Sequence, residues 1–364
     1  MDTARLFLLH AHLVAGIGPV FLSKLATVVQ NDFAQCYQWS ASDFIARVGC
    51  SPIQASALVV GLQDRSVLMR ELAFFQAHKV EWCTWLDPIY PEMLRSLYAP
   101  PPVLMWHGDF AGCIGKPAVA LVGARKASSY IQDVVQHLVP SLVAAGVVVV
   151  SGGARGADTF SHQATLRAGG KTIAVLGSGL QHVYPRENAR LFDEIVASGG
   201  VLLSSFPYTM AACPGNFPAR NRIVAGLASM TVVLQAARKS GALITAQCAL
   251  DAGRDVGAVP GSLFDPLSEG CHALIAQGAA IISSAEDIFA ACGWIALQEG
   301  FVQQSISDSA VRDPLVDACR EPKHFDELRL LFPDLLESIL QERLFELQLA
   351  QVVEQDFMGR FVAV

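Results

Sequence analysis

The chain has 364 residues, of which 52% are hydrophobic and 16% charged, and its formal net charge is −7. Its most apolar stretch, residues 138–150, is broken by Pro140 and Gly146 and is shorter than the about 20 residues of a membrane-spanning helix, so no membrane segment is expected. The nine cysteines include no C-x-x-C pair, which argues against a disulfide framework or a zinc site. Because the N-terminus also has no signal-peptide pattern, we expect a cytoplasmic protein.

Charge is distributed unevenly along the chain. Residues 1–114 contain 7 Lys and Arg against 9 Asp and Glu, for a net charge of −2. Residues 115–290 contain 13 against 11, for +2, and residues 291–364 contain 6 against 13, for −7. If the protein binds a polyanion, the cationic middle region is therefore the expected place.

Residues 1–75 are predicted to form a small helical N-terminal domain of the SAM or helix-hairpin-helix kind. Two short glycine-containing turns interrupt it, at residues 15–19 (AGIGP) and 47–52 (RVGCSP). A turn of this kind between helices can point backbone N–H groups at a phosphate. One such turn is weak evidence, so we favour a packing domain over a DNA-binding one.

Residues 78–290 are predicted to form an extended Rossmann-like domain. Its first part, residues 82–109, is rich in aromatic residues and proline and is expected to pack against a sheet as an extension. Beyond it, β-rich runs alternate with stretches that fit helices. The predicted strands are 118–122, 147–151, 172–176, 201–204, 231–234, 256–259 and 280–283, and the clearest predicted helices are 128–145, 158–168 and 188–197. This alternation predicts an α/β fold with a doubly wound parallel sheet.

Residues 291–311 are predicted to be a linker and residues 312–364 a C-terminal domain. The pattern of that domain is helix, helix, helix and hairpin, over residues 313–319, 325–331, 335–349 and 352–364. This order resembles a winged helix, whose third helix often lies in a DNA major groove. Here the third helix carries Glu337, Glu342 and Glu346 against only Arg343. Phosphate repulsion therefore predicts that this domain does not read DNA.

Glycine and arginine recur in the loops that follow the predicted strands. In an open parallel sheet these loops lie together at the carboxyl edge, where ligands bind. Glycine lets the backbone approach a phosphate closely, and arginine adds paired hydrogen bonds to phosphate oxygens. Several such loops on one edge suit an extended phosphate backbone better than one small ligand. The candidate binding residues are Gly123, Arg125, Lys126, Gly152, Gly153, Arg155, Gly156, Arg186, Phe217, Arg220, Asn221, Arg222, Ser240 and Thr245.

Cofactor binding and catalysis have thinner support. Neither a G-x-G-x-x-G after the first strand nor a Walker lysine motif is present, so no nucleotide cofactor is expected. Asp158 and His162 have the spacing of an acid–base pair on one helix, but a helix cap and a packed histidine are favoured. Because no cluster of carboxylates suggests paired metal ions, neither a metal site nor nuclease activity is expected.

Six motifs of the middle region, taken in order, resemble the DNA-processing protein A family (DprA, also called Smf). They are VGARKASSY, SGGARGADTFSHQATL, TIAVLGSGLQHVYPREN, FPARNRIVAGL, SGALITAQCAL and VPGSLFDPLSEGCHALIAQGA. The resemblance covers the whole predicted sheet. It implies a homodimer that binds and protects single-stranded DNA and hands it to the RecA recombinase during natural transformation.

The resemblance also implies roles for individual residues. Arg125 matches an arginine that contacts phosphate, and Arg186 matches a basic position after a Tyr-Pro pair. The family's F-P-x-R-N-R motif lines a nucleotide pocket, and it is matched here by Phe217, Arg220, Asn221 and Arg222. The family's glycine loop is matched by Gly152, Gly153 and Gly156. Base stacking on Phe217 would tolerate any sequence. The alternative for the motif is that one arginine holds the loop through an internal carboxylate.

Four positions depart from the family pattern. Ile131 and, in the tail, Gln351 stand where glycine is usual, and Ser205 and Gln235 stand where carboxylates are usual.

Two other functions stay open. The main rival function is that of a nucleotide-processing enzyme resembling phosphoribohydrolases, which use a glutamate near a glycine-rich motif. The corresponding stretch here, SGALITA, has no glutamate. A third interpretation makes the acidic tail an interaction surface.

Overall fold

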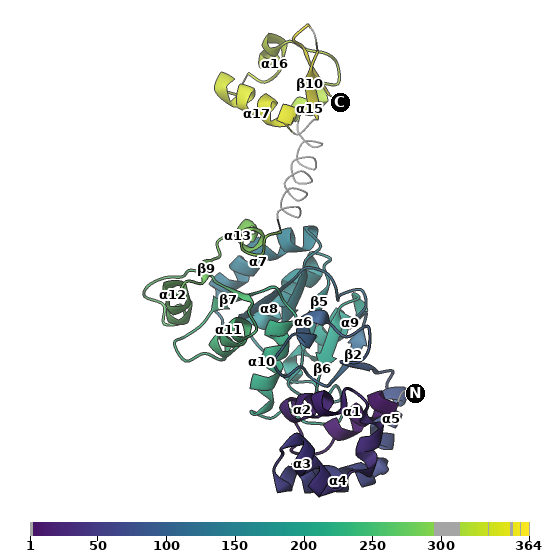
Figure 1. The fold of residues 1–364 in the computed structure, drawn as a ribbon. Helices are drawn as coiled ribbons and strands as arrows, with labels where there is room; N and C mark the ends of the chain where they lie inside the picture. Colours follow the sequence, from purple (N-terminus) through teal and green to yellow (C-terminus); the bar gives the residue numbers. More distant parts are fainter. Residues whose placement is uncertain (1–2, 295–313, 334, 350–351, 357, 364) are drawn as a thin grey trace. The chain divides into compact units, whose positions relative to one another are not determined.

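The structure of the chain is a computed structural model that describes residues 3–294, 314–333, 335–349, 352–356 and 358–363 (Figure 1). It divides into two compact units, Met1–Cys292 and Gly293–Val364. The division falls within the predicted linker 291–311, and residues 295–311 of that linker lie outside the described ranges.

The first unit begins with a group of short helices. Ser40 and Ser51 each cap the helix that follows, accepting hydrogen bonds from the backbone N–H groups of Asp43 and Gln54. The elements are α1 (Thr3–His12), α2 (Pro19–Val29), the 3-10 helix η1 (Phe33–Gln38), α3 (Ala41–Val48), α4 (Pro52–Gln63) and α5 (Arg65–Ala77). Most of residues 3–77 is therefore helical, in line with the prediction for this segment, and the status of residues 1–75 as a separate domain stays a prediction.

These helices share a hydrophobic core with the sheet that follows. Phe7, Phe33 and Phe44 are fully buried and belong to the same cluster as Leu104 and Trp106. The rings of Phe7 and Phe33 stack with their centroids 5.2 Å apart. Burial of such large side chains is a main source of stability, so the helices and the sheet support each other.

The centre of the first unit is a nine-stranded sheet with the order β1-β2-β6-β5-β4-β3-β7-β8-β9. The strands are β1 (Glu81–Thr84), β2 (Val103–Gly108), β3 (Ala118–Gly123), β4 (Val148–Ser151), β5 (Thr172–Val175), β6 (Val201–Ser204), β7 (Met230–Gln235), β8 (Asp255–Ala258) and β9 (Ala280–Ile281). From β6 to β9 the pairs are parallel, which confirms the predicted α/β fold with a large parallel sheet. The expected extension at residues 82–109 is itself part of the sheet, because β1 and β2 add to the β6 edge as antiparallel strands.

The order of the strands places a switch point between β3 and β7. The chain runs from β3 through β4 and β5 to β6, and then returns to the other side of β3 and continues through β7 to β9. The loops after β3 and β7 diverge there, which leaves the crevice where ligands bind in open α/β sheets. The helices of this region are α6 (Glu92–Arg95), α7 (Ser129–Ala144), α8 (Ala157–Arg167), η2 (Arg186–Asn188), α9 (Ala189–Ala197), α10 (Asn216–Gly226), α11 (Gly241–Asp251), α12 (Glu269–Ala276) and α13 (Ala285–Ala291).

The second unit has its own small core. Its described elements are α15 (Pro314–Ala318), α16 (Phe325–Leu331), α17 (Glu337–Leu349) and the hairpin of β10 (Val353–Gln355) and β11 (Phe361–Ala363). Leu328, Leu340 and Leu344 are buried between them, and Lys323 bridges to Phe361 beside the hairpin. The order of helices and hairpin is the predicted one.

Gly108 offers a test of how the antiparallel strands are attached. It pairs with Val201 of β6 at a φ of +103°, and an added Cβ would overlap the carbonyl oxygen of Gly200. We expect Gly108→Ala to lower the free energy of unfolding by about 2–4 kcal/mol, since backbone strain and a clash combine. Gly115→Ala is the control, because Gly115 has a φ of +74° but no atom near its missing Cβ. Urea unfolding would contradict this account if both variants lost the same free energy.

Candidate nucleic-acid interface

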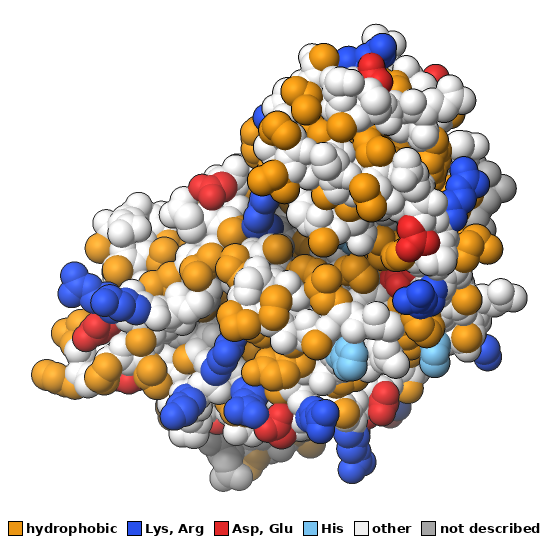
Figure 2. Space-filling model, turned by 90° about the horizontal axis from the view of Figure 1, so that it is seen from below, with side chains coloured by type: hydrophobic (Ala, Val, Ile, Leu, Met, Phe, Trp, Pro, Cys, Tyr) orange, Lys and Arg blue, Asp and Glu red, His pale blue; other side chains and the backbone are white. Residues whose placement is uncertain are grey.

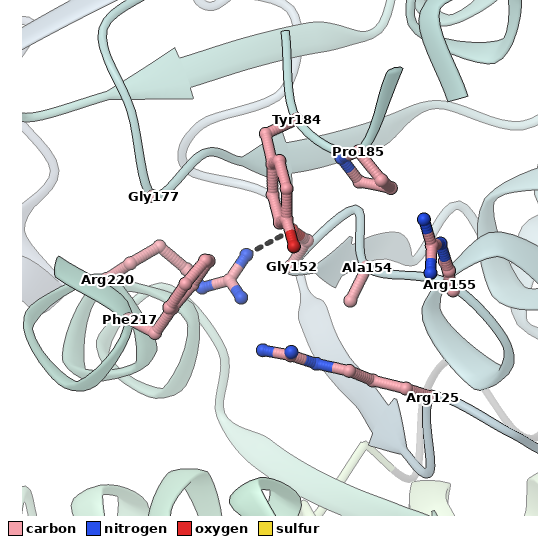
Figure 3. Close-up of a pocket in the computed structure, with 9 residues that line it drawn as sticks. All are labelled: Arg125, Gly152, Ala154, Arg155, Gly177, Tyr184, Pro185, Phe217 and Arg220. Carbon is pink, nitrogen blue, oxygen red and sulfur yellow. Dashed lines mark hydrogen bonds between the residues drawn. The ribbon is translucent and has the colours of Figure 1, made fainter. Parts of the chain in front are cut away.

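A groove of about 730 Å³ lies at the carboxyl edge of the sheet, at the switch point. Its walls are the loops after β3, β4 and β7 and the first turns of α10 and α11. It is continuous with a smaller pocket beside the loops after β4 and β5. Figure 2 shows one face of the molecule, on which Lys and Arg side chains stand among hydrophobic areas. The pocket is lined by Arg125, Gly152, Ala154, Arg155, Gly177, Tyr184, Pro185, Phe217 and Arg220 (Figure 3).

The F-P-x-R-N-R motif lies on a helix and not on a loop, which corrects the expectation for this segment. Its residues form the first turns of α10, where the fixed φ of Pro218 is compatible with a helix. The helix start is attached to the sheet edge, because the side-chain amide of Asn216 donates a 3.0 Å hydrogen bond to the carbonyl oxygen of Gly177. A helix holds the motif more rigidly than a loop would.

Phe217 presents its ring to the pocket among cations and a second aromatic ring. The Arg125 guanidinium lies 5.2 Å and that of Arg220 5.7 Å from the centroid of the ring. The Tyr184 ring is 5.9 Å away and tilted. A Cβ on Gly177 would lie 2.9 Å from the Phe217 ring, so the position of this ring depends on that glycine. The two rings provide surfaces on which a base can stack.

Arg220 is buried, with 5% of its surface exposed, and binds the protein itself. One terminal nitrogen donates to the carbonyl oxygens of Gly152 and Val175, the latter at 2.8 Å, and Nε donates to the Asn221 side chain at 3.0 Å. Burial lowers the pKa of Arg220, and the nearby Asp158 carboxylate opposes that shift. Arg220 thus has an internal role, as in the alternative interpretation of the motif, but its hydrogen bonds go to carbonyl oxygens and a side-chain amide and not to a carboxylate.

Arg125 and Arg220 nevertheless bring two positive charges to one pocket. In Figure 3 their guanidinium groups point into the same space, beside the Phe217 ring. The charge of Arg125 lowers the pKa of Arg220 further, as expected for like charges at short range. Among the described residues, none of those lining the pocket is acidic. An anion placed between the two arginines would relieve their repulsion.

The glycine loop after β4 is occupied by an internal carboxylate. Asp158 accepts hydrogen bonds from the backbone N–H groups of Gly152 and Ala154, at 3.1 and 3.2 Å. A side chain at Gly152 would overlap the Arg220 guanidinium, and one at Gly156, which has a φ of +74°, would overlap the Ala124 carbonyl. The glycines are therefore required by packing, and the amides of residues 152 and 154 already have a partner.

The other candidate residues divide into those that line the groove or pocket and those that do not. Arg125 and Lys126 are exposed and line the groove. Arg155 lines the pocket and pairs with Glu187, and not with Asp158. The residues that also line the groove are Gly123, Gly152, Phe217, Arg220, Asn221, Ser240 and Thr245, and those that line neither are Gly153, Gly156, Arg186 and Arg222.

The residues that line the groove or pocket outside the candidate set include an aromatic residue and a lysine. Tyr184 stands beside Phe217, and Lys239 lies in the groove next to Ser240. Both were accessible to sequence reasoning, since Tyr184 belongs to a Tyr-Pro pair between strands and Lys239 directly precedes a candidate residue. Tyr184 provides an additional stacking surface, and Lys239 provides an additional positive charge.

Three serines after the strands of the sheet bind the backbone, and the histidine considered for catalysis lies buried. The hydroxyl groups of Ser151 and Ser178 donate to carbonyl oxygens at 2.6 Å, and that of Ser240 caps α11. His162 is fully buried against Thr172 at 2.8 Å, and burial lowers its pKa to about 3. His162 is thus the packed histidine that was favoured.

Gln235 ties three segments together at the switch point. Its side chain accepts a hydrogen bond from the Ser128 backbone and donates to the Ser128 hydroxyl and the Asp265 carboxylate, all at 3.0 Å. A glutamate here would place a second carboxylate against Asp265. The amide therefore suits this site, where a carboxylate would be repelled.

Two further observations concern membrane spans and metal sites in the described part of the chain. Within it, no helix is long and apolar enough to cross a membrane. In the same residues, no group of three or more His, Cys, Asp and Glu side chains is placed to hold a metal ion.

Sequence comparison places the sheet region among known proteins. The family model for DNA recombination-mediator protein A matches residues 81–293. The chain is 44% identical over 222 residues to the DNA processing protein DprA of Bacillus subtilis, covering 61% of this chain and 74% of that protein. It is 36% identical over 302 residues to protein Smf of Synechocystis, covering 80% of this chain and 74% of the relative.

Solved structures agree with this assignment. The crystal structure of DprA from Streptococcus pneumoniae matches with a TM-score of 0.68 at 34% identity, over 80% of this chain and 98% of that one. DNA processing protein A from Helicobacter pylori, studied for its single-stranded DNA binding mode, matches with a TM-score of 0.52 at 29% identity, over 57% and 94%. Together with the motifs of the groove, these matches show that the chain belongs to the DNA recombination-mediator protein A family, also known as DprA or Smf.

Proposed function

We propose that this protein binds single-stranded DNA along the groove and delivers it to the RecA recombinase in homologous recombination and natural transformation. The observation that carries the proposal is the pocket in which the Phe217 ring lies beside two guanidinium groups and Tyr184. The proposal is also supported by the relative from Helicobacter pylori, which binds single-stranded DNA.

In the proposed complex, the pocket holds one nucleotide and the groove holds its neighbours. The base stacks on Phe217 or Tyr184, and its phosphate lies between Arg125 and Arg220. Lys126 and Lys239 contact the phosphates that follow. Stacking and charge are tolerant of sequence, so the protein would bind any single strand and shield it from nucleases.

The remaining parts of the chain have supporting roles in this proposal. The protein works as a homodimer in the cytoplasm. Residues 1–75 form a packing domain, and residues 312–364 form a winged helix that binds a protein and not a DNA duplex. The net charge of −7 over residues 291–364 supports that assignment, because it repels phosphate.

We expect Arg125→Ala to weaken binding to a labelled single strand and to make log K less steep against log salt by about 0.7, the value for one phosphate on a single strand. Fluorescence anisotropy over a salt series measures both. Arg190→Ala is the control, since the Arg190 side chain is 92% exposed on α9 and pairs with Glu194 of the same helix. If wild-type protein did not bind the strand, the proposed function would be wrong.

Arg220→Ala should behave differently from Arg125→Ala. It leaves two carbonyl groups without their donor and Asp158 without its nearby cation. We therefore expect the free energy of unfolding to fall by about 3–5 kcal/mol, as when one partner of a buried charge pair is removed. Thermal unfolding of both variants separates the two roles, and unchanged stability of Arg220→Ala would contradict the structural role.

Gly177→Ala should disturb the stacking surface without unfolding the protein. The added methyl group meets the Phe217 ring at 2.9 Å, and the ring can yield because its other side faces the pocket. We expect about a fivefold or larger loss of single-strand affinity, a fraction of one base-stacking interaction. Gly241→Ala is the control, since nothing lies near its missing Cβ and it lines the same groove.

We also propose that the protein is not an enzyme. The stretch SGALITA has no glutamate to serve a phosphoribohydrolase-like reaction. Gln235 stands where the family usually has a carboxylate, and Asp158 is held by two backbone amides. Incubation with nucleoside monophosphates should therefore release no free base above the rate of a heat-denatured sample. Release of base by purified protein, abolished by Asp158→Asn, would favour the nucleotide-processing alternative.

A further inference from the structure

The loop between β8 and α12 carries two large hydrophobic side chains that have no packing role. Phe264 is 95% exposed and Leu263 is 83% exposed. Fully exposed aromatic side chains lose favourable burial free energy, so a pair of this kind at one loop tip suggests contact with a ligand.

The loop is nevertheless firmly attached to the structure. The Asp265 carboxylate accepts hydrogen bonds from the Leu267 backbone at 2.9 Å and from the Gln235 side chain at 3.0 Å. The Tyr130 hydroxyl donates to the Pro260 carbonyl at 2.8 Å, just before the loop. The backbone on both sides of the two exposed side chains is therefore held in place, and a bound ligand would cost little backbone ordering entropy.

The same loop contributes to the wall of the groove. Leu267, three residues after Phe264, lines the groove together with Lys239 and Lys126. The Asp265 to Gln235 hydrogen bond connects the loop to the switch point. The loop that carries the exposed pair thus lies beside a groove that also holds Phe217 and several cations.

We propose that Phe264, with Leu263, is a second stacking surface for the bases of a single strand whose first contact is the Phe217 pocket. This inference rests on the proposed function and extends it by giving the strand a path. The strand crosses the ends of β5, β4, β3 and β7 in turn and reaches the loop after β8.

Charge and distance both fit this path. Lys126, Arg238 and Lys239 are exposed on the way, and they supply positive charge for the phosphates. At the loop itself the charged residues are acidic, because Asp265 is hydrogen-bonded there and Glu269 is exposed. Since carboxylates repel a phosphate, an uncharged base is the group that suits this part of the path. Four strand spacings of about 4.8 Å separate β5 from β8, or about 19 Å. At about 3.4 Å per phosphate, this is roughly six nucleotides of a stacked strand.

The test compares oligothymidylates of about three and about fifteen nucleotides, because only the longer one spans the groove. We expect Phe264→Ala to weaken binding of the longer strand by about five- to tenfold, the size of one lost base stack, and to leave the shorter one unchanged. Phe264→Trp should retain the affinity for the longer strand. Phe217→Ala should weaken both.

Tyr98→Ala is the matched control, since Tyr98 is also an exposed aromatic residue, with 83% of its surface exposed. It lies away from the pocket, because the neighbouring Leu97 packs near Gly226, at the opposite end of α10 from Phe217. Equal binding of the longer strand by wild type and Phe264→Ala would overturn this inference and leave the proposed function intact. A changed molar mass of Phe264→Ala in light scattering would also overturn it, since the loop would then contact a second copy. No binding by wild type would overturn both.

Discussion

The buried guanidinium of Arg220 is the interaction on which the groove depends. The carbonyl oxygens of Gly152 and Val175 lie beside the pocket, and without a donor they would repel a phosphate. Arg220 donates to the last carbonyl of β5 and to the first carbonyl after β4, so it neutralises both acceptors. Because it reaches them from α10, it also fixes the helix that carries Phe217. One side chain thus fixes the position of the pocket residues and contributes to the positive charge of the pocket.

The remaining positive charge has a different character. Arg125, Lys126 and Lys239 are exposed around the groove, where screening makes each contact modest. Such cations add affinity for a phosphate backbone without defining a position along it. The position comes from stacking on rings that are held by packing, as Phe217 is held against Gly177. Affinity and positioning therefore depend on different residues.

The sequence predicted the fold well and the site in part. The strands from 118 to 283 were readable because parallel strands buried on both faces form continuous apolar runs. The division among the arginines was not readable, since Arg220 and Arg222 look alike in sequence and only the packing of α10 buries one of them. The pattern predicted that the backbone amides of the glycine loop bind phosphate. The loop does lie at the site, but two of its amides donate hydrogen bonds to Asp158 instead. Periodicity reports burial of a strand, whereas the partner of a polar group depends on contacts distant in sequence.

The net charge of −7 argues less against nucleic-acid binding than it first suggests. At physiological salt, exposed charges farther apart than about 8 Å are largely screened from each other. A phosphate in the groove therefore responds to the cations within that distance and to the buried Arg220, which is screened least. Residues 201–250 contain four Lys and Arg and no Asp or Glu, and they form much of the groove wall. The local composition of the segments that meet at the switch point, and not the sum over the chain, decides which ligand the protein attracts.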